Sequence, residues 1–324
     1  MTSPLLLAEH LSKRFDNGVL AVDDVTITVH PGETVGVVGE SGCGKSTTAK
    51  LILGLLKVDA GYVAFDGMNL ATVTSATLQQ ARAKLQFVPQ NPQTSLNPRM
   101  TVAEAIAFNL RVHRWAKDDI GPRVATLLDM VGVPAAYAQR YPHELSGGQL
   151  QRVAIARALS TDPKLIVCDE AVSALDKSVQ AQVLNLLVDL QRELGMAYLF
   201  ISHDLAVVEH LSDRVVVMYL GRVVEESDAA ELWRHAAHPY TAALLSSVPG
   251  PGRRRVILSG DLPSPANPPS GCGFRTRCPV AIGACAEVKP DLVSIGIDGR
   301  HRAACIRAEE GVAETLTLEE VGAA

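Results

Sequence analysis

The amino-acid sequence predicts an α/β fold, because segments rich in β-forming residues alternate with stretches of helical composition along most of the chain. The predicted strands are short apolar runs at residues 21–29, 34–38, 61–65, 85–88, 164–168, 197–201 and 214–218. Strands that alternate with helices form a mostly parallel sheet covered by those helices. The 324 residues, 47% of them hydrophobic, can bury such a core and leave room for a second, smaller unit.

Two regions depart from the alternating pattern. Residues from about 92 to 160 have helical composition, with the clearest predicted helices at 101–112 and 123–131, and we expect a helical insertion in the core there. After Leu245 the chain becomes rich in Pro, Gly and Arg, which indicates a domain boundary. We therefore expect a first domain over residues 1–245 and an extension over 246–324, solvated beyond Glu309.

Composition excludes several classes of protein. A formal net charge of −5 without a basic stripe argues against nucleic acid as a partner, because phosphate binding there depends on clustered Lys and Arg. No apolar run approaches the roughly 20 residues that cross a bilayer, and the first residues lack the pattern of a signal peptide. We expect a cytoplasmic chain that reaches a membrane only through a partner.

The most specific motif is the sequence GESGCGKS at residues 39–46, in which two glycines separated by four residues precede Lys and Ser. It follows an apolar run at 33–38 and precedes a predicted helix at 47–56, so its backbone amides and the helix start can bind phosphate. Lys45 would reach the β and γ phosphates, and Ser46 would hold magnesium. The predicted phosphate-binding residues are Gly39, Glu40, Ser41, Gly42, Cys43, Gly44, Lys45, Ser46 and Thr47.

A second motif is the apolar strand 165–168, which ends in Asp169 and Glu170. The carboxyl ends of buried parallel strands are where α/β folds present side chains to ligands. Asp169 would complete the magnesium site, and Glu170 would polarise an attacking water. An Asp-Glu pair after a strand is common by itself, so the assignment of these two roles depends largely on the phosphate loop earlier in the chain.

The sequence LSGGQ at residues 145–149, within PHELSGGQLQRVAIARAL, resembles the signature of ATP-binding cassette (ABC) proteins. Gln90 in FVPQNPQ, the SALD sequence at 173–176 and His203 in ISHD follow the family's motif order, and the resemblance covers residues 5 to 225. It implies a P-loop NTPase core with a helical subdomain. It also implies a head-to-tail dimer that buries two ATP molecules, in which the signature residues of one subunit cover the γ-phosphate held by the other. Those residues are Ser146, Gly147, Gly148 and Gln149.

The resemblance assigns further roles. It implies that Gln90 contacts magnesium and senses a membrane partner, that His203 contacts the γ-phosphate and orients the water, and that Phe15 stacks on adenine. An ordinary core position is the alternative for Phe15. Glu170, His203 and Lys45 are then the catalytic set. Family members commonly have Pro after the catalytic Glu, where this chain has Ala171.

The sequence after residue 237 narrows the subfamily. HPYT at 238–241 and LPSPANPPSGCGFRTRCP at 262–279 resemble the C-terminal extension of bacterial dipeptide and oligopeptide importer ATPases, and related nickel importers share parts of it. The resemblance implies a peripheral ATPase on the cytoplasmic face of the membrane. Its partners would be two transmembrane permease subunits, a second ATPase subunit (identical or related) and, indirectly, a solute-binding protein. The alternatives are a nickel or other small-solute importer and a soluble, non-transport ABC ATPase.

The last four cysteines, Cys272, Cys278, Cys285 and Cys305, predict a metal site, because a reducing compartment disfavours disulfides. Structural zinc usually takes paired cysteines two to four residues apart, and no such pair is present, whereas an iron–sulfur cluster tolerates wider spacing. Zinc and a site without metal remain alternatives. The resemblance implies a 4Fe-4S cluster in this extension.

Overall fold

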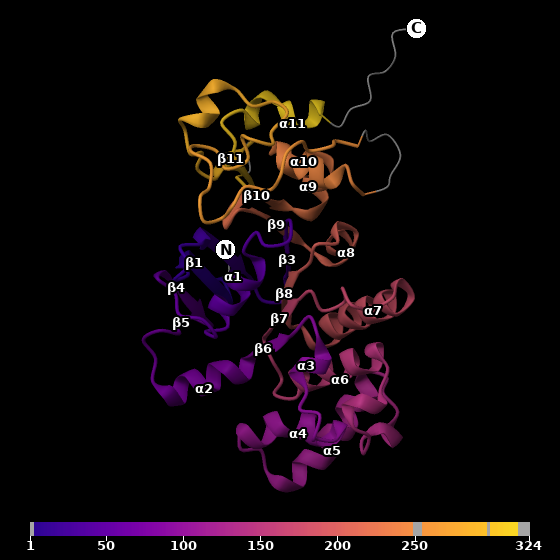
Figure 1. Cartoon of the computed structure of the whole chain (residues 1–324). Coiled ribbons are helices and arrows are strands. Elements are labelled where there is room, and N and C mark those ends of the chain that lie inside the picture. The colour runs from indigo at the N-terminus through magenta and orange to yellow at the C-terminus, as the bar shows by residue number, and fades with distance from the viewer. Residues whose placement is uncertain (1–2, 249–254, 297–298, 317–324) are drawn as a thin grey trace.

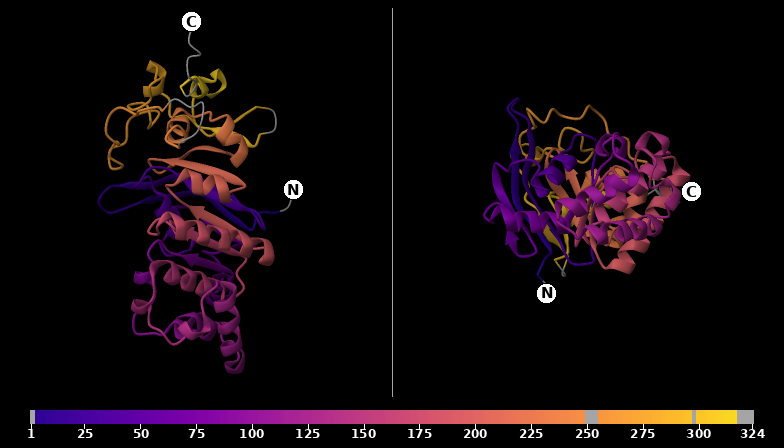
Figure 2. Two further views of the ribbon diagram at one scale, coloured as in Figure 1. Left: turned by 90° about the vertical axis from the view of Figure 1, so that its right-hand side faces the viewer. Right: turned by 90° about the horizontal axis from the view of Figure 1, so that it is seen from below.

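The computed structural model describes residues 3–248, 255–296 and 299–316. The chain forms a mixed α/β core with a helical region at one end and the C-terminal extension at the other (Figure 1). The side view of Figure 2 shows the same order, with the sheets between these two parts. The helical region, which includes the residues predicted as a helix at 123–131, therefore lies on one side of the core. The extension, which follows residues 249–254, lies on the other side.

The central sheet has eight strands in the order β11-β12-β10-β9-β3-β8-β7-β6. The five strands from β9 to β6 run parallel, whereas β10, β12 and β11 are joined to that edge by antiparallel pairs. The bounds are β3 (Thr34–Val38), β6 (Leu85–Val88), β7 (Leu165–Asp169), β8 (Ala197–Ile201), β9 (Arg214–Tyr219), β10 (Arg222–Asp228), β11 (Val293–Ile295) and β12 (His301–Ala303).

The parallel strands are mainly apolar because both of their faces are covered. Along β7, Val167 packs into one hydrophobic cluster and Cys168 into the other, and both side chains are fully buried. One cluster lies between the central sheet and a second sheet together with α1, and the other lies under the helices α6 to α10. Alternation with a period of two assigns each side chain to its face.

The second sheet corrects the expectation of one mostly parallel sheet. The predicted strands at 21–29 and 61–65 exist, but they belong to a separate antiparallel sheet in the order β2-β1-β4-β5. Its strand β1 was not predicted, because Glu9, His10 and Lys13 interrupt the apolar pattern on its outer face. The bounds are β1 (Leu6–Arg14), β2 (Leu20–Val29), β4 (Ala60–Phe65) and β5 (Met68–Asn69).

Helices fill the connections between strands. The α-helices are α1 (Lys45–Ile52), α2 (Ser75–Lys84), α3 (Pro92–Ser95), α4 (Val102–Val112), α5 (Lys117–Met130), α6 (Gly147–Leu159), α7 (Lys177–Leu194), α8 (Leu205–Leu211), α9 (Ala229–Arg234), α10 (Pro239–Leu245) and α11 (Val312–Thr315). The short 3-10 helices are η1 (Ala135–Tyr137), η2 (Pro142–Glu144), η3 (Gly283–Ala286) and η4 (Ala308–Glu310). The helix expected at 47–56 therefore begins and ends earlier, as α1.

The helical insertion contains α3 to α6, as its composition predicts. Thr101 and Glu104 form a capping box that starts α4 at the predicted place. By contrast, α5 begins at Lys117, six residues before the predicted helix at 123–131. Its N-cap Ala116 makes no side-chain hydrogen bond, and Pro122 lies inside the helix. The helix therefore starts without a capping side chain and contains a residue that usually breaks helices.

The extension is attached to the core sheet through β12, which pairs with β10. Glu225 of β10 is fully buried, and its carboxylate accepts a hydrogen bond from Nε2 of His301 of β12 at 2.7 Å. The expectation that residues beyond Glu309 are solvated is wrong for α11, because Ala313 is fully buried and the helix packs on α10. Residues 317–324 of that segment lie outside the described residues.

Candidate nucleotide site

The phosphate loop joins β3 to α1 and requires glycine at both ends. A Cβ atom on Gly39 (φ +150°) would lie 2.2 Å from the carbonyl oxygen of Met218, and one on Gly44 (φ +105°) would lie 2.3 Å from that of Ala21. Any side chain at Gly39 or Gly44 would collide with backbone atoms, and backbone atoms cannot move aside as the end of a flexible side chain can. The loop is therefore clamped between β9 and β2.

Lys45 lies inside this loop. Its side chain is buried, and the ammonium donates to the carbonyl oxygens of Gly39 at 2.7 Å and Glu40 at 3.0 Å. The loop thereby holds a positive charge at the start of α1, where the helix dipole also favours an anion. This arrangement suits a phosphate chain.

Ser46 and Asp169 meet at the edge of the loop. The Ser46 hydroxyl donates to Oδ1 of Asp169 at 2.9 Å, although the two residues are 123 positions apart. Burial raises the pKa of the Asp169 carboxyl, and the hydrogen bond from Ser46 opposes that rise. Two hard oxygen donors at one point fit magnesium, which takes one or two protein ligands and fills its remaining positions with phosphate oxygens and water.

Glu170 has an unusual backbone conformation and two polar neighbours. Its φ is +49°, in the left-handed region, and its amide donates to the carbonyl of Ile201 at 2.9 Å. Oε2 of Glu170 accepts from Nε2 of Gln90 at 2.8 Å and lies 3.3 Å from Nδ1 of His203. Strain of this kind, held by neighbouring hydrogen bonds, is concentrated at functional sites.

Three strand ends supply these groups. Gln90 follows β6, Glu170 follows β7 and His203 follows β8, and these strands are neighbours in the parallel sheet. The carboxyl edge of the sheet thus brings together an amide, a carboxylate and an imidazole beside the Ser46–Asp169 pair. Such a set can hold a water molecule, accept its proton and bind developing negative charge.

Comparison with known proteins agrees with this geometry. Residues 22–173 match the family described as ABC transporter, and residues 224–285 match the family described as oligopeptide/dipeptide transporter, C-terminal region. The oligopeptide transport ATP-binding protein OppF of Salmonella typhimurium is 50% identical over 297 residues, which cover 89% of this chain and 88% of that protein. The chain belongs to the ABC transporter ATP-binding family. Among its other relatives, the putative oligopeptide transport ATP-binding protein YkfD of Bacillus subtilis is 49% identical over 90% of this chain and 92% of its own length.

Solved ABC ATPases have the same fold. The cbiO1 protein of Clostridium perfringens, part of the ABC transporter complex cbiONQ, is 29% identical with a TM-score of 0.65, over 72% of this chain and 92% of its own. An ATP-binding cassette in a dimeric, post-hydrolysis state bound to ADP and Pi is also 29% identical, with a TM-score of 0.62, over 69% of this chain and 98% of its own. This chain is thus an ABC ATPase.

The signature of this ABC ATPase forms a second helix start. Ser146 caps α6, with its hydroxyl accepting from the amide of Gln149 while the Gln149 side chain accepts from the amide of Ser146. Gly148 must be glycine, because a Cβ atom there would lie 2.4 Å from Cγ1 of Val179 on α7. Ser146 and Gly147 are exposed, and α6 lies in the helical region, on the far side of the central strands from α1 (Figure 1).

Phe15 lies in the turn between β1 and β2 and is 37% exposed, so it is not a core residue. Its exposed ring leaves the predicted stacking on adenine open.

The four C-terminal cysteines line one small cavity in the extension. Burial raises the pKa of the Cys278 thiol to about 11, and the other three cysteines are close enough to influence it. Among the residues that the structure describes, no three His, Cys, Asp or Glu side chains gather as ligands of a single metal ion. The thiols thus share a cavity without converging on one point.

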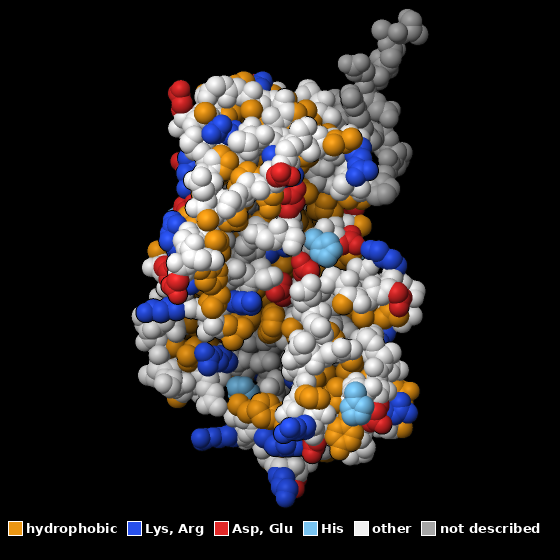
Figure 3. Space-filling view, viewed as in Figure 1, with side chains coloured by type: hydrophobic (Ala, Val, Ile, Leu, Met, Phe, Trp, Pro, Cys, Tyr) orange, Lys and Arg blue, Asp and Glu red, His pale blue; other side chains and the backbone are white. Residues whose placement is uncertain are grey.

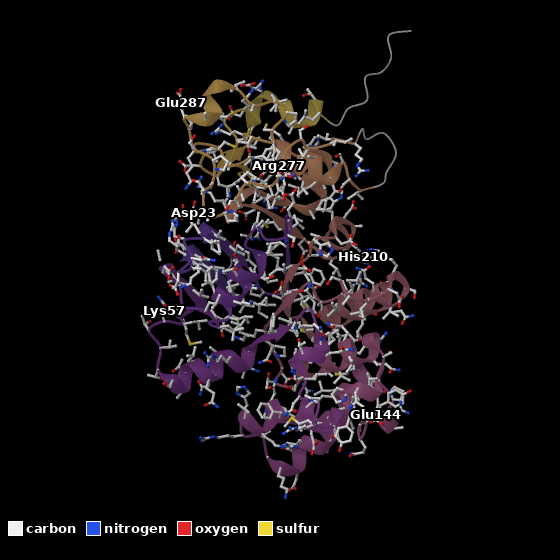
Figure 4. The ribbon with its side chains drawn as sticks, in the orientation of Figure 1. Asp23, Lys57, Glu144, His210, Arg277 and Glu287 are labelled. Carbon is white, nitrogen blue, oxygen red and sulfur yellow. The ribbon has the colours of Figure 1, made fainter. Side chains whose placement is uncertain are left out.

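Sequence reasoning missed one contact of the phosphate loop. Arg277, in the extension (labelled in Figure 4), binds the carboxylate of Glu40, and the hydroxyl of Tyr240 accepts from the amide of Glu40 at 2.8 Å. Arg277 stands 237 positions from Glu40 in the sequence. Neither periodicity nor motif spacing could connect residues so far apart.

Proposed function

We propose that this chain is the ATPase subunit that powers an importer of dipeptides or oligopeptides. The observation that carries the proposal is the presence, in one chain, of a complete phosphate loop with its carboxylates and a C-terminal region that matches oligopeptide/dipeptide transporters over residues 224–285. Curated relatives named as oligopeptide or peptide import ATP-binding proteins support the same cargo.

The site residues divide the hydrolytic reaction among them. The loop amides and Lys45 bind the phosphates, and Ser46 and Asp169 would hold magnesium, which neutralises charge on the β and γ phosphates. Glu170 accepts a hydrogen bond from the water that attacks the γ-phosphorus, and ADP leaves as the bond to its β-phosphate oxygen breaks. His203, beside Glu170, would donate to a γ-phosphate oxygen. Gln90 donates to Oε2 of Glu170, and the remaining acceptor positions of that carboxylate can bind the water.

A second ATPase subunit completes each site. The amides at the start of α6 form an anion site, and Ser146 and Gly147 are exposed. In a head-to-tail dimer this helix start would cover the γ-phosphate bound to the partner's loop, so that ATP closes the pair and hydrolysis releases it. We infer a heterodimer with a related subunit. A native mass of the purified transporter that shows two identical copies of this chain would contradict that inference.

The permease subunits would bind in a groove between the core and the helical region. This hollow of about 530 Å³ is lined by β6, α3, α4 and the end of α2, and it is visible in Figure 3. Leu55 and Phe108, which line it, are 62% and 49% exposed. Strand β6, which forms one wall of the groove, ends two residues before Gln90, and Gln90 donates a hydrogen bond to Glu170. A partner that displaces β6 would therefore also displace Gln90 and alter its contact with the catalytic carboxylate.

This groove makes a specific test possible. No helix within the described residues is long and apolar enough to cross a bilayer, so attachment to the membrane would depend on such partners. We expect Phe108→Glu to abolish co-purification with two membrane proteins while ATP binding by the isolated chain is unchanged. The matched control is Leu194→Glu, at a hydrophobic residue that is similarly exposed (48%) but lies outside the groove. Co-purification of Phe108→Glu at the level of the control would exclude the groove, and an absence of membrane partners in both would favour a non-transport ATPase.

Cargo is tested in a strain that lacks this chain. We expect uptake of short peptides to fall to the background of the strain and to return when the gene is restored. Unchanged peptide uptake together with lost nickel uptake would reverse the choice in favour of the related nickel importers.

We further propose that the four-cysteine cavity holds a 4Fe-4S cluster. The cavity lined by all four thiols supports a multinuclear centre, and the lack of convergence on one point among the described residues is unfavourable to a single zinc ion. Its role would be structural, because ATP hydrolysis has no redox step. Anaerobically purified protein should be brown and contain about four irons per chain, whereas Cys278→Ser should lose both features. Colourless protein with one zinc per chain would rule the cluster out.

A further inference from the structure

Arg277 forms a bidentate ion pair with the second residue of the phosphate loop. Nη1 donates to Oε2 of Glu40 at 2.8 Å and Nη2 to Oε1 at 3.0 Å, the two-pronged geometry that makes arginine–carboxylate pairs specific. The side chains are 10% and 26% exposed, so the pair is largely shielded from water. The hydrogen bonds that Arg277 donates to Glu40 raise the pKa of the guanidinium above its usual range.

The segment that carries Arg277 is anchored in the core. Phe274 is buried between Tyr219 of β9 and Tyr240 of α10, with ring centroids 5.3 Å and 5.4 Å away, and the amide of Arg277 donates to its carbonyl. Tyr240 also accepts from the amide of Glu40. The extension therefore holds the side chain of this loop residue through Arg277, and α10 holds its backbone through Tyr240.

We propose that Arg277 is a positioning residue for the phosphate loop, through which the C-terminal extension sets the affinity of the ATPase for nucleotide. Glu40 places a negative charge within a loop whose task is to bind a polyanion. Arg277 neutralises that charge and fixes the carboxylate on the side of the loop that faces the extension. Without Arg277, the carboxylate is unpaired and repels the phosphates.

The first measurement is the KM for MgATP of the complete transporter with Arg277→Ala. We expect KM to rise about tenfold, because one partner of a largely buried charge pair is removed, while kcat stays within about twofold. A high salt concentration should reduce the difference in KM between Arg277→Ala and the parent protein, because salt screens the charge of the unpaired Glu40 carboxylate. Arg277→Lys should have an intermediate effect, because a lysine keeps the charge but cannot form the bidentate pair.

The decisive variant is Arg277→Ala combined with Glu40→Gln. Glutamine keeps the size of the side chain and removes its charge, so we expect KM to return to within about twofold of the parent protein. A merely structural role for Arg277 would not be rescued in this way. A double variant that remains as impaired as Arg277→Ala would overturn the proposal.

The matched control is Arg275→Ala, two residues away in the same segment. The Arg275 guanidinium bonds the carbonyl and hydroxyl of Ser270 within the extension, away from the phosphate loop. Its KM should equal that of the parent. An Arg277→Ala protein that matches this control, or that loses kcat at unchanged KM, would also overturn the proposal. If Arg277→Ala does not fold, Arg277→Lys with and without Glu40→Gln gives the same comparison. None of these outcomes depends on whether the cargo is a peptide.

Discussion

The two helix starts that we propose as phosphate sites differ in what surrounds them. The start of α1 lies among groups from distant parts of the same chain, which include Asp169 and Arg277. The start of α6 has its cap satisfied by its own Ser146 and Gln149, and it is exposed. In the dimer that we propose, the same dipole and the same backbone amides would make one half of a site that is complete in the chain and another that a second chain completes.

Loss of the catalytic carboxylate is the strongest test of the complete half. We expect Glu170→Gln to lower ATP hydrolysis by the assembled transporter about 10³-fold, because the water loses its proton acceptor, while ATP binding is retained and the closed dimer accumulates. Steady-state hydrolysis and native mass measure the two effects. The control Glu209→Gln changes an exposed carboxylate on α8 and should leave both unchanged. Hydrolysis by Glu170→Gln at the parent rate would show that the base is another group.

Loss of the loop cation tests binding rather than chemistry. Lys45→Ala should weaken ATP binding by the isolated chain by about 2–3 kcal/mol, roughly 100-fold, because a charged hydrogen-bond donor to phosphate is removed. Titration calorimetry gives this value directly. Lys57→Ala, at an exposed lysine outside the loop (Figure 4), should bind ATP like the parent. If the two variants bind alike, Lys45 does not contact the nucleotide.

The exposed helix start can be tested without loss of its cap. Aspartate caps a helix as well as serine does, so Ser146→Asp should fold normally, yet it directs a negative charge at the partner's γ-phosphate. We expect at least about tenfold slower hydrolysis by the transporter and unchanged ATP binding by the isolated chain. Thr74→Asp makes the same kind of change at the N-cap of α2 and is the control. Weakened ATP binding by isolated Ser146→Asp would mean that the two helix starts share a site within one chain.

The last test concerns α10, whose Tyr240 accepts a hydrogen bond from the amide of Glu40 in the phosphate loop. Burial lowers the pKa of His238 from 6.5 to about 4. Below pH 6.5 the unfolded chain therefore takes up a proton that the folded chain refuses, so the free energy of unfolding falls as the pH drops, by at most about 3 kcal/mol at pH 4, and is unaffected above pH 6.5.

Asparagine can replace His238 as the cap of α10, where Nδ1 accepts from the amide of Tyr240, and it does not titrate. The unfolding midpoint of His238→Asn should depend less on pH below 6.5 than that of the parent, whereas the exposed His210→Asn should behave like the parent. An equal acid dependence in all three proteins would show that His238 is not buried in its neutral form.

The sequence predicts those parts of the fold whose signals are local. The strands at 85–88 and 197–201 have the predicted bounds, because strands of a covered parallel sheet are short runs of mainly apolar residues. The sequence does not assign the strands at 21–29 and 61–65 to a separate sheet, because the residue pattern within a strand does not show which other strand it pairs with. The early start of α5 was missed for a different reason, the lack of a capping side chain at Ala116.

The sequence by itself predicted the two helix starts that we propose as phosphate sites, because a glycine loop and a capping box act over fewer than ten residues of backbone. It also named Ser46 and Asp169 as one site, and the sheet brings them into contact. Only the tertiary structure decided that Glu40 is paired with Arg277 and that β12 extends the core sheet. These contacts join segments that are far apart in the chain. They form because the extension packs against β9 and β10, and no local sequence pattern encodes that packing.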